Sequence, residues 1–338
     1  MTKETTKDAL AILEKEIGPN SEIYGFDKFI DTGYAPLNKI ISNKYKDGGL
    51  PYGRIIEIVG ESSSGKTLLA TKFMIEVQKL GGVAIFIDWE RSFSIKLAQD
   101  LGLNIERPYF FYFTPDTWEA GNMIATKICA IIREKKIIDE SAPIISIFDS
   151  MASAVPAQSI SKEIDAYGMN DTTALARVAS TTLKVMNQRA WKTNATFVYL
   201  NQVRTVPGAY VPTTSTPGGK AMEYQSSVRL FVSKKKLVDK EKKYCGQRIM
   251  IEARKNKMTK PFQTCCIDMY YNDENVPEFD YVSSIIDELI AQDKLETSGA
   301  WIVFDGKKYY KSQLVQKVNE EGLYQKLCDI LENDKQEA

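Results

Sequence analysis

Histidine is absent from the 338 residues of this chain. Without imidazole groups, serine–histidine–aspartate triads, histidine acid–base catalysis and most zinc sites are excluded, so carboxylates, amides and a phosphate-bound metal must carry any chemistry. The five cysteines show no CxxC spacing, and the adjacent Cys265 and Cys266 would point to opposite faces of a strand. This pattern favours reduced structural thiols over a redox pair.

Long apolar runs and a net charge are also lacking. No run approaches the roughly 18 residues of a membrane span, and the first residues show no secretory signal. We therefore expect a cytoplasmic protein without membrane contact. The 44 basic and 44 acidic residues cancel, so any binding of nucleic acid must depend on local placement of charge.

A phosphate-binding pattern, GxxxxGK followed by Thr, is the most informative feature present. An apolar run comes first, the loop follows it, and a helical pattern begins after the loop at Leu68. The loop consists of Gly60, Glu61, Ser62, Ser63, Ser64, Gly65, Lys66 and Thr67. This order directs backbone N–H groups and a helix dipole at one point, where Lys66 reaches outer phosphates and Thr67 offers a hydroxyl to Mg²⁺. The pattern also arises by chance, but its flanking strand and helix favour binding of a nucleoside triphosphate.

Short apolar strands alternate with helices through the middle of the chain. We expect strands at 54–59, 83–88, 144–149 and 196–200, and helices at 68–79, 119–135 and 172–192. The alternation predicts an α/β fold with a mostly parallel sheet flanked by helices. Later strands near 228–232, 248–253 and 264–271 have no long helices between them and suggest an antiparallel extension.

Three regions follow from this pattern. Residues 1–33 hold a short amphipathic helix and a linker, and this helix must dock on the chain's own core or on a neighbouring subunit. Residues 34–277 form the nucleotide-binding core. Residues 278–338 form a small α/β lobe with a helix, a hairpin at 301–310, a closing helix and a short tail.

Three further strand ends carry polar residues suited to a triphosphate: Glu90, Asp149 and Gln202. Ligands of an open parallel sheet lie beyond the carboxyl ends of its strands. Glu90 could orient or deprotonate an attacking water, Asp149 could hold Mg²⁺ through its water shell, and Gln202 could bond the γ-phosphate. The structural alternatives are a plain strand-end carboxylate, a helix N-cap and a buried amide. The set supports in-line attack of water on the γ-phosphate.

Two stretches without strong secondary-structure signals leave the same edge, at about 156–171 and 203–219. Long loops in a compact domain are usually functional or mobile. Around them lie candidate contacts for a nucleic acid: basic Arg177, Lys184, Arg204 and Lys220, apolar Met169, Val206 and Tyr210, and the glycines Gly218 and Gly219. Solvation of a surface explains the charges equally well. The lysine-rich segment 234–243 is interpreted as a solvated turn rather than a second DNA surface.

The chain resembles the RecA recombinase family over nearly all of its length. The resemblance rests on motifs that occur in the family's order: residues 48–55, 86–90, 115–117, 201–204, 218–221, 227–230, 255–257 and 299–301. It implies a RecA-type core that binds ATP and Mg²⁺ between protomers. It also implies a homo-oligomeric helical filament on single-stranded DNA, which pairs with homologous double-stranded DNA and exchanges strands.

Positions within these motifs carry implied roles. Glu90 would activate water and Gln202 would sense the γ-phosphate, while Lys255 and Lys257 would reach ATP from the adjacent protomer. Asp116 and Tyr271 would flank the adenine, the two loops would line the DNA, and Tyr224 would lie at the protomer interface. Trp89 departs from the family, which has a small residue beside the catalytic carboxylate, and the two loop lengths differ slightly.

Three other functions share parts of this pattern. A P-loop kinase would need an acceptor pocket and usually an arginine-bearing lid, neither of which is evident. A non-hydrolysing accessory factor would tend to lose Glu90 or Gln202, and both are present. A hexameric helicase would have different flanking regions. The sequence therefore favours a DNA-dependent ATPase that acts as a recombinase.

Overall fold

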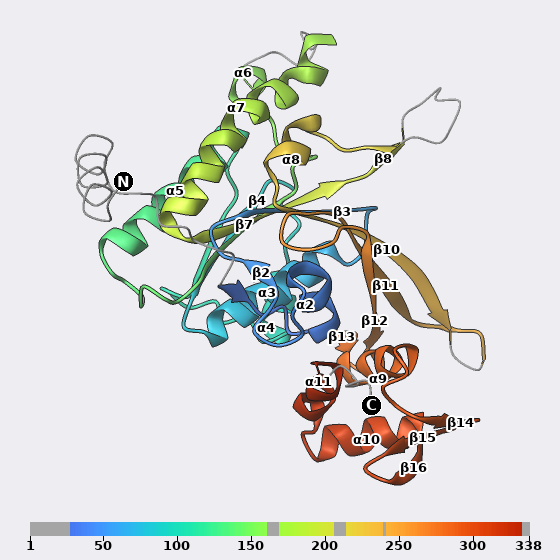
Figure 1. Cartoon of the computed structure of the whole chain (residues 1–338). Helices are drawn as coiled ribbons and strands as arrows, with labels where there is room; N and C mark the ends of the chain where they lie inside the picture. The colour runs from blue at the N-terminus through green and yellow to red at the C-terminus, as the bar shows by residue number, and fades with distance from the viewer. Residues whose placement is uncertain (1–27, 161–168, 206–213, 239–240, 333–338) are drawn as a thin grey trace, which may run out of the picture.

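A nine-stranded sheet forms the centre of the protein (Figure 1). The computed structural model describes residues 28–160, 169–205, 214–238 and 241–332. Across the sheet the order is β13 (Pro277–Asp280), β12 (Gln263–Tyr271), β11 (Tyr244–Asn256), β10 (Val228–Val238), β3 (Ile55–Gly60), β7 (Ala195–Gln202), β6 (Ile144–Asp149), β4 (Val83–Asp88) and β5 (Phe110–Phe113). Strands from β10 to β5 are parallel, and those from β10 to β13 are antiparallel. The mixed α/β class is thus confirmed.

The expected strands are present, with one correction. β4 and β6 have the predicted bounds, and β3 and β7 agree closely with prediction. The sequence suggests that β10 belongs to an antiparallel extension, but it pairs in parallel with β3, and only its other edge is antiparallel. The reason is that the connection from β7 passes through the short helix α8 (Lys220–Gln225) and returns to the edge where β7 began.

Helices cover both faces of the sheet (Figure 1). On one face, α2 (Ala35–Ser42), α3 (Lys66–Lys79) and α4 (Ile95–Asp100) share a buried core with alternate residues of β3 such as Ile56 and Ile58. On the other, α5 (Trp118–Glu134) and α7 (Met169–Thr193) share a second core that includes Ile55. Side chains of a strand point alternately to its two faces, so one strand contributes to both cores.

The C-terminal lobe has its own core. It comprises α9 (Tyr281–Ala291), β14 (Thr297–Ser298), β15 (Trp301–Phe304), β16 (Lys307–Tyr310), α10 (Lys311–Glu320) and α11 (Tyr324–Glu332). The predicted hairpin has the expected bounds, whereas the sequence pattern does not predict α10, nor α2, α4 and β5. Ala35 and Tyr45 of the larger part pack into the lobe's core, so the two parts are in contact.

Smaller elements complete the described residues. β1 (Phe29–Ile30) pairs with β2 (Leu50–Pro51), β8 (Arg204–Thr205) pairs with β9 (Thr214–Ser215), and α6 (Ala157–Ile160) follows β6. The predicted N-terminal helix lies outside the described residues. Within the part that the structure describes, every helix is too short or too polar to cross a bilayer.

Candidate nucleotide site and adjoining loops

The phosphate loop connects β3 to α3, as the sequence predicts (Figure 1). Gly65 has φ of 93°, and a Cβ there would lie 2.7 Å from the Ile249 side chain of β11. A Cβ at Gly60 would lie 2.5 Å from the Val232 carbonyl oxygen of β10. Both positions therefore require glycine, because the loop turns tightly against the two strands beside it.

Lys66 lies inside this loop. Its Nζ donates to the carbonyl oxygens of Gly60 at 3.0 Å and Glu61 at 2.7 Å. Burial of the ammonium lowers the pKa of Lys66, which makes an added anion a favourable partner. The Ser64 hydroxyl is buried and has no hydrogen-bond partner among the described residues. A buried unpartnered hydroxyl and a partly desolvated ammonium fit the oxygens of a bound phosphate.

Thr67 and Asp149 meet at the start of α3. The Thr67 hydroxyl donates to Oδ2 of Asp149 at 2.8 Å, and Asp149 is almost fully buried at the end of β6. Burial, together with the nearby carboxylates of Glu90 and Asp88, raises the pKa of Asp149 to about 7. A cation beside this carboxylate would favour its ionised form. The two side chains fit the predicted Mg²⁺ contact.

Glu90 and Gln202 also meet, although they come from different strand ends. The Gln202 side-chain amide donates to Oε1 of Glu90 at 2.9 Å, and the hydroxyl of Ser150 donates to the same oxygen. The parallel strands β4 and β7 both end at this edge, with β6 between them. The structure therefore brings the two residues together as the shared edge predicts.

The residues before Glu90 fix its loop. Asp88 accepts hydrogen bonds from the backbone N–H groups of Arg91 at 2.7 Å and Phe93 at 3.0 Å. Asp88 therefore has a structural role, because it holds the turn that follows β4. Trp89 points into the core, where its indole donates to the Thr117 carbonyl at 3.1 Å. The unusual tryptophan thus anchors the backbone next to Glu90 to the start of α5.

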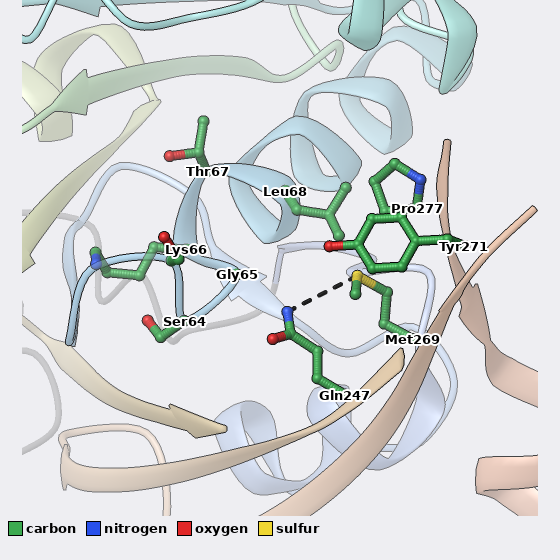
Figure 2. A pocket seen from close by; sticks show the side chains of 10 residues that line it. Ser64, Gly65, Lys66, Thr67, Leu68, Gln247, Met269, Tyr271 and Pro277 are labelled. Carbon is green, nitrogen blue, oxygen red and sulfur yellow. Dashed lines mark hydrogen bonds between the residues drawn. The ribbon is translucent and has the colours of Figure 1, made fainter. Parts of the chain in front are cut away.

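A cavity of about 230 Å³ adjoins the phosphate loop (Figure 2). Residues 63–68 form one wall, and Gln247, Met269, Tyr271 and Pro277 form the other. Figure 2 shows the Tyr271 ring across the cavity from the start of α3. The structure therefore places the aromatic ring that was predicted to contact the adenine beside the phosphate loop.

Asp116 lies elsewhere. It follows β5, at the opposite end of the sheet from Tyr271 on β12, and pairs with Arg91 at 2.8 Å. Seven strand spacings of about 4.8 Å separate β12 from β5, roughly 34 Å across the sheet. Within one protomer the two residues cannot flank the same base. A shared contact would need two protomers, and it stays a prediction.

Lys255 and Lys257 lie away from the phosphate loop of their own chain. Lys255 pairs with Arg229, which pairs with Glu57 in the middle of β3, whereas the loop follows the end of β3. The Lys255 ammonium donates to the carbonyl oxygens of Glu223 and Tyr224 at the end of α8. Lys255 therefore does not contact the phosphate loop of its own chain, and a contact with nucleotide in another protomer stays a prediction.

The candidate DNA contacts fall partly inside the described residues. Arg177 and Lys184 are exposed on α7, and Gly218, Gly219 and Lys220 lead into α8. A Cβ at Gly219 would lie 3.3 Å from that of Ala176, so the end of the second loop meets α7 beside Arg177. Val206 and Tyr210 lie outside the described residues; for Met169 and Arg204 only the backbone is described.

Sequence reasoning missed one residue of the phosphate loop's surroundings. Lys234 on β10 donates to the carbonyl oxygens of Ser62 at 3.1 Å and Ser63 at 2.8 Å. The sequence pattern puts it in a lysine-rich turn, and only the parallel pairing of β10 with β3 brings it to the loop. No signal in the sequence indicates that pairing.

The loop between β3 and α3, with Thr67 and Asp149 at one edge of a mainly parallel sheet, defines a P-loop nucleotide-binding protein. The family is equally clear, because the family model described as RecA N-terminal domain matches residues 7–275. This chain belongs to the RecA family.

Two relatives of known name agree with this assignment. The chain is 32% identical over 319 residues to Protein RecA of Mycoplasma mycoides subsp. mycoides SC, covering 93% of this chain and 87% of the relative. It is 34% identical over 269 residues to Protein RecA of Staphylococcus aureus strain JH9, covering 79% and 72%. A solved structure, described as the RadB recombinase, is 19% identical with a TM-score of 0.49 and covers 74% of this chain and 99% of that one.

Proposed function

We propose that this protein is an ATP-dependent recombinase that forms a helical filament on single-stranded DNA, hydrolyses ATP faster when DNA is bound, and pairs that DNA with a homologous duplex. The observation that carries the proposal is the hydrogen bond between Gln202 and Glu90. It joins the carboxylate that would activate water to the residue just before a loop that carries candidate DNA contacts.

The chain's own residues divide the hydrolytic work. Lys66 and the loop N–H groups would bind the β- and γ-phosphates, and Thr67 with Asp149 would hold Mg²⁺, which supplies charge neutralisation when bound. Glu90 would accept a proton from the attacking water. Gln202 would exchange its bond to Glu90 for a γ-phosphate oxygen, which frees Glu90 and repositions the loop that follows.

In the filament, the neighbouring protomer would supply further positive charge at the nucleotide. Lys255 and Lys257 would reach the nucleotide of the neighbouring protomer, since they lie at the end of β11 and just beyond it, away from their own phosphate loop. Such an arrangement makes hydrolysis depend on assembly and assembly depend on nucleotide. Arg177 and Lys184 on α7 would contact the DNA backbone beside the loop that ends at Gly219.

The test is ATP hydrolysis measured with and without single-stranded DNA at fixed Mg²⁺, with Lys66→Ala as the inactive control. We expect the rate to rise at least tenfold with DNA. Equal rates would overturn the proposal and favour a kinase or an accessory ATPase. Electron microscopy with a slowly hydrolysed ATP analogue should show helical filaments on DNA, whereas closed rings would favour a helicase.

A further inference from the structure

A buried ion pair lies under the loop edge of the sheet. Glu57, in the middle of β3, is fully buried, and its Oε2 accepts a hydrogen bond from Nε of Arg229 at 2.5 Å. The Arg229 side chain is 12% exposed. A buried ion pair is weak evidence for stability, because apolar residues of similar volume often stabilise a core as well or better. Its presence therefore calls for another role.

Asn201 connects this ion pair to the loop. It is fully buried at the end of β7, and its Nδ2 donates to Oε1 of Glu57 at 2.8 Å and to the Pro217 carbonyl at 3.1 Å. Its Oδ1 accepts the backbone N–H of Gln202 at 2.9 Å. One amide side chain thus bonds both the residue before segment 203–216 and the residue after it.

Glu57 decides how that amide is oriented. The two ends of an asparagine side chain have similar shapes, and hydrogen-bond partners select one orientation. An ionised carboxylate only accepts, so it requires the Nδ2 end of Asn201 to face it. The Oδ1 end must then face Gln202. Burial raises the pKa of Glu57, and the Arg229 guanidinium opposes this shift, so the ion pair favours the ionised carboxylate and the position that impose this choice.

We propose that Glu57, held by Arg229, is a positioning residue for DNA-stimulated ATP hydrolysis, and that it acts through Asn201 on Gln202 and Pro217. Gln202 bonds Glu90 at one end of the segment, and Pro217 leads through two glycines into α8 at the other. Because both ends of the segment are held, a displacement at the DNA contacts would be transmitted to Gln202. This inference rests on the proposed function.

Arg229 extends the same network toward the protomer interface. Its guanidinium lies 4.0 Å from the carboxylate of Glu223 on α8, and the Glu223 carbonyl accepts a hydrogen bond from Lys255. The ion pair therefore lies between the loop ends and the lysine expected to act in trans. Loss of its charge should disturb communication between the two without changing the phosphate loop.

The test compares Glu57→Gln with a matched control, Asp268→Asn. The amide introduced by Glu57→Gln would keep the volume but present a donor to either Arg229 or Asn201, so the orientation of the Asn201 amide is no longer imposed. Asp268 forms a short but more exposed pair with Arg248, at 2.6 and 2.7 Å, outside this network. Both variants should lower the melting temperature.

Only Glu57→Gln should change the response to DNA. We expect its DNA-free hydrolysis and its KM for ATP to stay within twofold of wild type, while the DNA-stimulated kcat falls about tenfold. Hydrogen exchange of the Gln202 amide and of α8 should increase in Glu57→Gln and not in Asp268→Asn. An equal loss of stimulation in both variants would show a merely structural effect and overturn the inference.

A second variant tests the inference if Glu57→Gln does not fold. Asn201→Ala leaves the ion pair in place and should show the same tenfold loss. Where Glu57→Gln does fold, the double variant should lose no more than Asn201→Ala alone, because residues acting through one another are not additive. Additive losses, or full stimulation in either single variant, would overturn the inference. A wild-type enzyme that DNA does not stimulate would instead overturn the proposed function.

Discussion

Gly121 in α5 offers a prediction with an unusual sign. A Cβ at this position would lie 2.5 Å from Cζ2 of Trp89 and 2.9 Å from Cγ2 of Ile87. Trp89 cannot easily move, because it is 5% exposed, bonds the Thr117 carbonyl, and stacks on Trp118 with ring centroids 5.3 Å apart. Replacing this helical glycine with alanine should therefore destabilise the protein.

The magnitude follows from two opposing effects. Alanine is favoured over glycine inside a helix by about 1 kcal/mol. Overpacking of a dense core costs roughly 1–3 kcal/mol, and a 2.5 Å contact belongs at the upper end. At its upper end, the overpacking cost of about 2–3 kcal/mol exceeds the helix preference of about 1 kcal/mol. We therefore expect Gly121→Ala to lower the free energy of unfolding by about 1–2 kcal/mol.

The same substitution should stabilise once the indole is removed. Trp89→Ala alone should cost about 3–5 kcal/mol through the cavity it leaves. In that background Gly121→Ala should regain up to about 1 kcal/mol, because the Ile87 methyl, 2.9 Å from the added Cβ, can shift into the space that the indole leaves, and the helix preference then dominates. The four proteins are compared by urea unfolding followed by far-ultraviolet circular dichroism. If Gly121→Ala changes stability by the same amount in both backgrounds, the contact with Trp89 does not exist in solution.

Further predictions concern the site. Glu90→Gln should keep ATP and DNA binding but slow turnover at least a hundredfold, and unaltered turnover in a single-turnover assay would remove Glu90 from the chemistry. Burial, with the charges of Lys257 and Arg229, lowers the pKa of Lys255 to about 8. The ammonium is lost above that pH, so nucleotide-dependent assembly, followed by light scattering, should weaken as pH rises through 8, and Lys255→Arg should remove this dependence. Arg177→Ala should reduce the salt slope of DNA binding by roughly 0.7 for the phosphate contact it removes, and an unchanged slope would place Arg177 away from the backbone.

The sequence predicted the parts of the site that depend on contiguous residues or on strand direction. The phosphate loop is a local pattern, and its strand and helix have close to the expected bounds. Glu90 and Gln202 are 112 positions apart, yet they meet because parallel strands end at a common edge. Their chemical roles stay predictions, since their proximity is compatible with a structural hydrogen bond as well.

Contacts that depend on pairing of distant strands could not be predicted. Glu57 lies within an apolar strand, and a buried acid of this kind needs a partner, but the sequence does not indicate that Arg229 is that partner. Lys234 belongs to a run of similar lysines, and only the sheet register selects it. Asp116 is assigned to the adenine by resemblance alone, and because it lies across the sheet from Tyr271 in its own protomer, that contact would need two protomers and stays a prediction.

α8 is the element that connects Lys255 to the loop that ends at Gly219. It has only six residues, so few of its carbonyl groups are bonded within the helix, and its end depends on outside donors. Lys255 supplies them to Glu223 and Tyr224. Under the proposed function, a phosphate of the neighbouring protomer competes with these carbonyls for the same ammonium. Binding in trans would then loosen the helix that follows Gly219, while Asn201 keeps the other end of the loop in register with Gln202. Under this proposal, the short length of α8 would allow a single lysine to influence the loop that ends at Gly219.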